Sequence, residues 1–279
     1  MDLKLSLFTA GYCTSREHFI FPDRPWRRVS IPAHCALIEH PTRGLILIDT
    51  GYAPAFFQAT QRLPYRIFRW LTPTVVTPDD TIRAQLASRK IGADQVKTVL
   101  ITHFHPDHIA GLNDFPDAVY LFLPEAYAAV RTRRGLAALN AAFLPDLMPP
   151  DFERRAQPIE PDRVCALPGA YVPFAQGYDI LGDGSLLGVS LPGHAHGQLG
   201  LFLHDQFSHP VFLIADACWH SRAFRELIYP HPLTNRLQAD AAAYRQTLHR
   251  LHHLHRRQPD LTIVPFHCPE VVTTTPYFR

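Results

Sequence analysis

Short apolar runs rich in β-branched and aromatic residues recur along the chain, and they constrain its fold more than any other feature. Most are bounded by Gly, Pro, Asp or Asn, so we predict that they are strands. They cover residues 3–8, 34–40, 44–50, 96–102, 118–123, 185–191, 199–204, 210–216 and 261–266. Helical patterns lie between them at 79–90, 124–139 and 237–257. This mixture predicts an α/β (α+β) chain whose helices cover sheets.

The domain organisation follows from length and pattern. The chain has 279 residues, of which 47% are hydrophobic, so it can bury a substantial core. It contains no internal repeat and no linker long enough to mark a boundary. We therefore predict a single domain over 1–279, with insertions at about 52–78 and 140–161 where the regular pattern is interrupted.

Charge and cysteine usage exclude several classes of protein. Lys plus Arg number 27 and Asp plus Glu number 25, which is too balanced for a nucleic-acid-binding protein. The 5 cysteines are widely spaced and form no CxxC pair, which favours a reducing, cytoplasmic location over a disulfide framework. No run approaches the roughly 18 apolar residues of a membrane span, and the N-terminus does not resemble a signal peptide.

A dense group of potential metal ligands follows the apolar run at 96–102. The sequence THFHPDH places His103, His105, Asp107 and His108 on one loop at the end of a predicted strand. Imidazole and carboxylate groups suit Zn, Fe, Co or Mn. Four donors this close together fit poorly around one ion, so we expect two ions to share the loop.

Three further strand ends each deliver a residue of the same chemical type. His194 lies in LPGHAHG, Asp216 ends FLIAD, and His267 lies in VPFHCP. Each alone is more often an ordinary polar residue than a ligand. Because loops at strand ends carry the ligands in α/β folds, their joint occurrence indicates one metal site.

Together, THFHPDH, PGH, the strand-ending Asp and the late His resemble the metallo-β-lactamase superfamily, and LILIDTG at 45–51 resembles its second strand. The resemblance implies a four-layered αββα sandwich with the metals at one edge between the sheets. It implies that His103, His105 and His194 bind one metal, that Asp107, His108 and His267 bind the other, and that Asp216 bridges both. It also implies that Asp49 orients a metal-bound histidine from outside the ligand set.

The resemblance implies a hydrolase with two divalent cations, Zn²⁺ in the first place and Fe, Mn or Co as alternatives. A hydroxide bridging two such cations attacks a carbonyl or phosphoryl group, and Asp107 passes a proton to the leaving group. The closest resemblance is to the N-acyl homoserine lactonase branch, so we expect a small ester or lactone as substrate. A thioesterase, a phosphodiesterase and a non-catalytic metal-binding sensor remain alternatives.

One position departs from the lactonase pattern. Where those lactonases carry a tyrosine, three residues after the bridging aspartate, this chain has Trp219, followed by His220. We expect Trp219 to face the substrate and His220 to act as the catalytic hydrogen-bond donor, with an ordinary surface histidine as the alternative.

The 52–78 insertion bears on the substrate. We expect Phe56, Phe68 and Trp70 to line a pocket for an apolar substrate, the alternative being ordinary core packing. Three arginines among these aromatics make a peripheral membrane contact a further possibility. The oligomeric state does not follow from the sequence.

Overall fold

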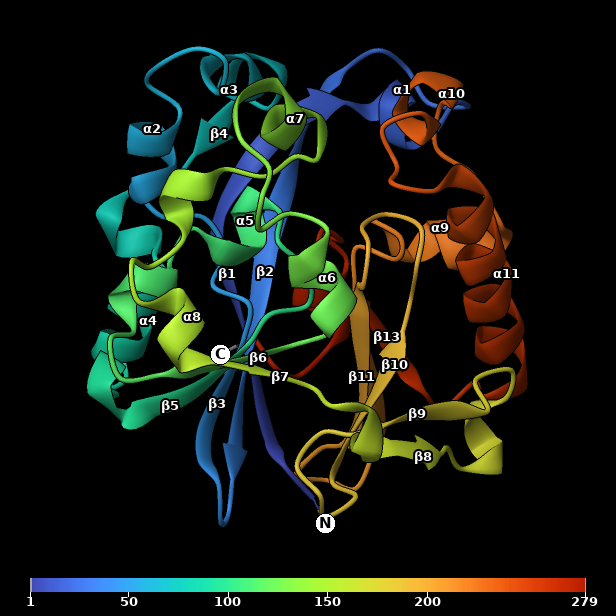
Figure 1. The fold of residues 1–279 in the computed structure, drawn as a ribbon. Coiled ribbons are helices and arrows are strands. Elements are labelled where there is room, and N and C mark those ends of the chain that lie inside the picture. Colours follow the sequence, from blue (N-terminus) through green and yellow to red (C-terminus); the bar gives the residue numbers. More distant parts are fainter. Residues whose placement is uncertain (1, 279) are drawn as a thin grey trace.

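Two β-sheets stack face to face in this computed structural model, which describes residues 2–278 (Figure 1). The first sheet has the strand order β4 (Thr74–Val75), β1 (Lys4–Arg16), β2 (Arg28–His40), β3 (Gly44–Ile48), β5 (Val96–Leu100), β6 (Val119–Phe122) and β7 (Ala156–Pro158). The second has the order β13 (Thr262–Pro265), β12 (Pro210–Ala215), β11 (Leu199–His204), β10 (Leu186–Ser190), β9 (Gln176–Asp179) and β8 (Val164–Ala166).

Both sheets mix strand directions. In the first, β4, β1, β2 and β3 pair antiparallel, whereas β3, β5, β6 and β7 pair parallel. In the second, only β12 and β13 pair parallel among the described strands. The parallel strands β3 and β5 of one sheet, and β12 and β13 of the other, therefore deliver neighbouring loops at their carboxyl ends.

Helices cover the outer faces of the sheets (Figure 1). They are α1 (Glu17–Ile20), α2 (Ala55–Ala59), α3 (Arg66–Leu71), α4 (Ile82–Ser88), α5 (Pro106–Ile109), α6 (Pro124–Ala128), α7 (Gly135–Asn140), α8 (Phe152–Arg155), α9 (Ser221–Glu226), α10 (Pro232–Asn235), α11 (Ala241–Arg257) and α12 (Val271–Thr274). α4 buries Ile82 and Leu86 in a cluster with Leu47 and Val99 of the first sheet, and α11 packs on the second. A separate cluster between the sheets joins residues such as Ile48 to Leu213. This layering confirms the predicted αββα sandwich.

Several predicted elements differ in extent from the observed ones. The helix predicted over 124–139 is broken into α6, which ends at Ala128, and α7, which begins at Gly135; at φ +57°, Gly135 has a left-handed conformation that a continuous helix does not contain. The strand predicted over 3–8 continues to Arg16 as β1. A register shift between Thr9 and Tyr12 spans Gly11, at φ +76°, and lets the pairing with β2 continue beyond the apolar run.

The two interrupted segments both add to the first sheet. Segment 52–78 forms α2, α3 and β4, and β4 pairs with β1 at one edge. Segment 140–161 contains α8 and β7, and β7 pairs with β6 at the other edge. Among residues 2–278, no helix combines the length and apolar character required to cross a bilayer.

Candidate metal centre

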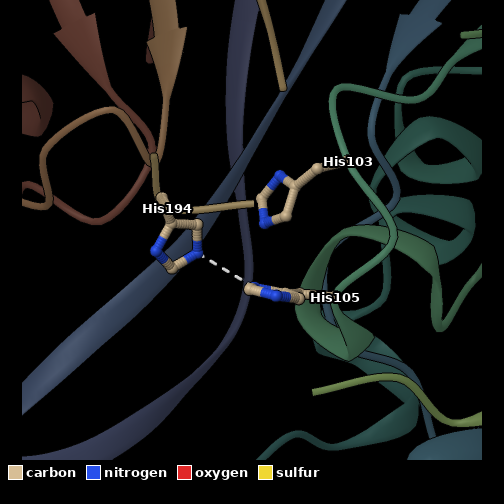
Figure 2. Close-up of side chains that lie close together, drawn as sticks. All are labelled: His103, His105 and His194. Atoms are coloured by element: carbon tan, nitrogen blue, oxygen red, sulfur yellow. Dashed lines mark hydrogen bonds between the residues drawn. The ribbon is translucent and has the colours of Figure 1, made fainter. Parts of the chain in front are cut away.

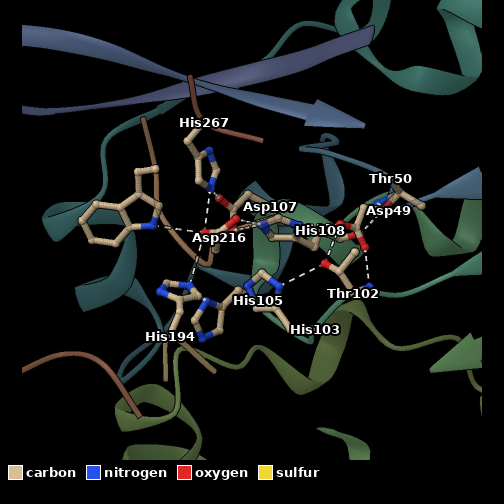
Figure 3. A network of polar contacts seen from close by, with 12 residues as sticks. Asp49, Thr50, Thr102, His103, His105, Asp107, His108, His194, Asp216 and His267 are labelled. Carbon is tan, nitrogen blue, oxygen red and sulfur yellow. Dashed lines mark hydrogen bonds and ion pairs between the residues drawn. The ribbon is translucent and has the colours of Figure 1, made fainter. Parts of the chain in front are cut away.

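Seven histidine and aspartate side chains meet at the carboxyl ends of four strands (Figure 3). His103, His105, Asp107 and His108 follow β5, the last two on α5, whereas His194, Asp216 and His267 follow β10, β12 and β13. They form three overlapping groups, and within each group the potential ligand atoms lie within 4.8 Å of one another. These groups are His103/His105/His194, His103/His108/Asp216 and Asp107/His108/His267. The first converges on one point from two loops (Figure 2).

The Asp216 carboxylate lies at the middle of the cluster. Its Oδ1 is 3.1 Å from His108 Nε2, and its Oδ2 is 3.2 Å from His194 Nε2 and 2.9 Å from His267 Nε2. Asp107 Oδ2 is 3.3 Å from His267 Nε2. Asp216 therefore contacts histidines from each side of the cluster.

Acceptors outside the cluster hold the second nitrogen of several rings. His108 Nδ1 is 2.7 Å from Asp49 Oδ2, His194 Nδ1 is 2.9 Å from Gln238 Oε1, and His267 Nδ1 is 2.6 Å from the Pro32 carbonyl. With the proton on Nδ1, each of these rings turns the lone pair of Nε2 toward the centre of the cluster, as a metal ligand must.

Asp49 makes the most connections among these outer residues. It is fully buried and accepts hydrogen bonds from the Thr102 amide at 2.8 Å and the Thr102 hydroxyl at 2.7 Å, in addition to the contact with His108. Thr102 Oγ1 is in turn 3.1 Å from His103 Nδ1. Asp49 thus contacts the His108 ring directly and the His103 ring through Thr102.

The protonation of the histidines divides them into two kinds. Burial lowers the pKa of His103 and His105 well below the ordinary value, so both rings are neutral near pH 7. Burial opposes charge on His267 as well, but the carboxylates of Asp216 and Asp107 outweigh it and raise its pKa to about 8. The same balance raises the pKa of His108 well above the ordinary value, through Asp216 and Asp49.

These shifts predict a pH dependence for metal binding to the metal-free protein. A cation must displace the proton from His267, whose raised pKa keeps the ring charged below about pH 8. Apparent affinity should therefore rise with pH toward that value, about tenfold per pH unit for each proton released. Isothermal titration with Zn²⁺ or Co²⁺ in buffers of different ionisation enthalpy measures the apparent affinity and the number of protons released. Affinity independent of pH between 6 and 8 would contradict this assignment.

Unpartnered buried atoms test whether the site suits a cation. His103 Nε2 is buried without a hydrogen-bond partner, as are His108 Nε2 and Asp216 Oδ1, which lie 3.1 Å apart without hydrogen-bond geometry. An unsatisfied buried polar group costs about 1–3 kcal/mol. Nitrogen and carboxylate donors facing one another in this way fit divalent cations of the zinc type.

Trp219 lies beside the cluster. Its Nε1–H donates to Asp216 Oδ2 at 3.2 Å, and its ring meets the His194 ring edge to face at 5.8 Å. The indole N–H is therefore a hydrogen-bond donor in direct contact with the cluster.

His220 does not join the seven-residue cluster, and its role as a hydrogen-bond donor to the substrate stays a prediction. Its Nδ1 accepts from the Arg222 amide and caps α9, and its Nε2 faces Glu270 Oε1 at 3.8 Å. His220, Cys268 and Glu270 form another compact group, but a neutral ring that accepts at Nδ1 carries its proton on Nε2. It then has no lone pair to offer a metal there.

The three residues predicted to line a substrate pocket differ in their exposure to solvent. Phe56 is fully buried and packs edge to face on Tyr52, Phe57 and Phe68, so it belongs to the core and does not line a pocket. Phe68 is half-buried and packs against the same hydrophobic core as Phe56. Trp70 is 63% exposed and, together with Arg66, Arg69, Pro73 and Thr74, lines a cavity of about 510 Å³.

The sequence pattern missed three groups that hydrogen-bond to histidines of the cluster: Gln238, Thr102 and the Pro32 carbonyl. Thr102 adjoins the histidine motif and has a recognisable hydroxyl. Gln238 lies in a segment with no motif, and a backbone carbonyl leaves no trace in the sequence. Their contribution depends on the fold alone.

Comparisons with known proteins agree with this geometry. The family model for the metallo-beta-lactamase superfamily matches residues 31–121. The chain is 27% identical over 259 residues to a probable metallo-hydrolase of Mycobacterium tuberculosis, covering 87% of this chain and 76% of that protein. It is 26% identical over 241 residues to the N-acyl homoserine lactonase AttM of Azorhizobium caulinodans, covering 82% and 81%.

A solved structure gives the same result for the fold. An N-acyl homoserine lactone hydrolase, with the product N-hexanoyl-L-homoserine bound at its catalytic metal centre, superposes with a TM-score of 0.75. The match covers 100% of this chain and 98% of the other at 19% identity. The fold is therefore shared along the whole chain, although few residues are.

Proposed function

We propose, from the premise that the chain is a hydrolase of the metallo-β-lactamase superfamily, that it binds two divalent cations and opens a small lactone or a related carboxylic ester. An acyl lactone is the first candidate, because the relatives include proteins named as N-acyl homoserine lactonases. Zn²⁺ is the first candidate metal, since nitrogen and carboxylate oxygen are among its usual ligands.

The position of Asp216 is the observation that supports two cations most directly. Its two oxygens contact His194, which belongs to one ligand group, and His108 and His267, which belong together to another. His103, His105 and His194 would hold one cation, Asp107, His108 and His267 the other, and Asp216 would contact both. When bound, two such cations supply a deprotonated water at neutral pH and polarise a carbonyl oxygen.

The side chains themselves supply orientation and proton transfer. Asp49, Gln238 and the Pro32 carbonyl keep the histidine rings in place, so little reorganisation is required during the reaction. The Asp107 side chain is 15% exposed, more than that of Asp216 or His108. We assign Asp107 the transfer of a proton to the oxygen that leaves when the ester bond breaks.

A substrate panel tests the function. The metal-replete protein should open short and medium-chain acyl lactones, measured by proton release at constant pH. Thioesters and phosphodiesters of similar size serve as comparison substrates. Faster turnover of either class would reject the lactone assignment and retain the metal-dependent hydrolase.

Trp219 provides a sharper test of how the substrate is held. Its N–H already donates at the cluster, so we expect it to hydrogen-bond a substrate oxygen there. Trp219→Phe keeps the aromatic ring and loses the donor, and should lower kcat/KM for a lactone about tenfold or more. Trp219→Tyr restores a donor and should maintain or raise activity. Equal losses in both variants would show that shape, not the donor, matters.

A further inference from the structure

Exposed apolar side chains gather at one end of the molecule. Among the described residues they are Trp26, Leu63, Trp70, Leu71, Val75, Leu136, Leu233 and Leu237, and we call this set the apolar rim. Leu237 is 83% exposed and Leu71 is 75% exposed, so neither packs against the rest of the chain. Soluble proteins expose single apolar residues routinely, but a group of them marks an interaction surface.

Four separate segments build the rim, and two specific contacts join them in pairs. The Gly135 amide donates to the Tyr65 hydroxyl, which connects the start of α7 to the segment that carries α3. The His231 amide donates to the Phe19 carbonyl, which connects α10 to α1. Figure 1 shows α3, β4 and α7 on one side and α1 and α10 on the other, all at the top of the view. The elements that carry the rim therefore all lie at the same end of the sandwich.

Unpaired arginines accompany these apolar residues. They are Arg62, Arg66, Arg69, Arg131, Arg133, Arg134 and Arg236, and the segments 54–78, 126–145 and 227–239 contain no Asp or Glu. None of the seven forms an ion pair with a carboxylate within residues 2–278. Arginines elsewhere do, as in Arg155 with Asp151, Arg222 with Glu226 and Arg225 with Glu270. Near Trp26, Arg27 pairs with Glu17.

We propose that the apolar rim docks the protein on the surface of a bilayer that contains anionic phospholipids. Trp and Leu side chains insert at the boundary between headgroups and acyl chains, while arginines on the same surface reach phosphate groups. Three of the arginines and four of the apolar residues lie within the single segment 62–75. The three segments 54–78, 126–145 and 227–239 combine apolar and cationic side chains and contain no acidic ones, which matches the apolar and the anionic part of such a membrane.

A second copy of the chain fits this surface less well. A symmetric dimer would bring the same patch of both subunits together, and here that patch carries seven unpaired arginines. Like charges held at an interface oppose association. A nucleic acid would attract the arginines through its phosphates, but its backbone offers no apolar surface to the leucines. A membrane accounts for both the arginines and the leucines of the rim.

Vesicle sedimentation tests the proposal without any substrate. Purified protein should pellet with vesicles of phosphatidylcholine and phosphatidylglycerol and stay in solution with phosphatidylcholine alone. Binding should weaken as salt is raised, because the arginine contribution is screened. Equal binding to both vesicle types, or binding to neither, would overturn the proposal.

Matched variants locate the surface. Arg62→Gln with Arg131→Gln removes two exposed charges from the rim and should lower partitioning about 10- to 30-fold. Leu71→Ser with Leu136→Ser removes two exposed apolar groups and should lower it about tenfold or more. Arg256→Gln with Arg257→Gln, on the exposed end of α11, and Phe207→Ser, at a residue 54% exposed, are the controls. The controls should bind like the parent protein.

Two outcomes would contradict this assignment. If the control variants lost binding as much as the rim variants, attraction would be diffuse and the rim would not be a docking site. If sedimentation velocity revealed a dimer that Leu71→Ser with Leu136→Ser dissociates, the rim would be a contact between subunits. Both results are independent of whether the metal centre hydrolyses lactones.

Discussion

Replacing Asp216 with alanine should abolish hydrolysis, lowering kcat/KM at least about a thousandfold, and should leave the purified protein nearly free of metal. The reason is that the Asp216 carboxylate contacts His108, His194 and His267 at 2.9–3.2 Å. Among the carboxylates of residues 2–278, Asp216 alone contacts all three, and the substitution removes it. Elemental analysis of the variant, together with the lactone assay, measures both effects.

Asp205→Asn is the matched control for Asp216→Ala. Asp205 is also fully buried, but it accepts a hydrogen bond from the Tyr277 hydroxyl at 2.7 Å, outside the candidate metal centre. This control should lose stability and keep its metal. Circular dichroism then separates loss of metal from loss of fold. Parental activity in Asp216→Ala would contradict the site.

Asp49→Ala should weaken metal binding about 10- to 100-fold, although Asp49 is not assigned as a ligand. Asp49 holds the His108 ring at 2.7 Å and accepts two hydrogen bonds from Thr102, which itself contacts His103. Without it, both rings lose their fixed orientation, and the buried Thr102 amide loses its acceptor. Competition with a chelator of known affinity measures the change.

Asp183→Ala provides the comparison for Asp49→Ala. Asp183 also forms a carboxylate–histidine pair, with Oδ2 3.1 Å from His40 Nε2, but this pair lies outside the metal cluster. Its loss should alter stability without altering metal affinity. Unchanged affinity in Asp49→Ala would show that the His108 and His103 rings hold their positions without it.

The sandwich and the cluster were predictable because their signals are local. An apolar run followed by His or Asp marks a strand end, and four such ends lie together in the structure. The far half of β1 was not predictable, since it is polar and partly exposed and depends on pairing with β2. Gln238 and the Pro32 carbonyl were not predictable either, because only the tertiary fold brings them to the histidines.

His220 and Phe56 have surroundings that their neighbours in the sequence do not suggest, and the physical cause is the same for both. His220 follows Trp219 directly in the sequence, but the start of α9 uses its ring to accept the Arg222 amide. Phe56 lies in an aromatic segment, yet α2 turns it into the core against Tyr52. Neighbourhood in sequence suggests a shared site, whereas the direction of each side chain is fixed by the local helix.

Metal content per chain, measured by elemental analysis on protein purified without chelators, tests the central claim most directly. The proposal predicts about two divalent cations per chain, lost together with lactone hydrolysis on dialysis against chelator and restored with it when Zn²⁺ is returned. A protein that opens lactones at the full rate with no bound metal would contradict it. So would a protein that takes up no divalent cation from metal-rich buffer at pH 8.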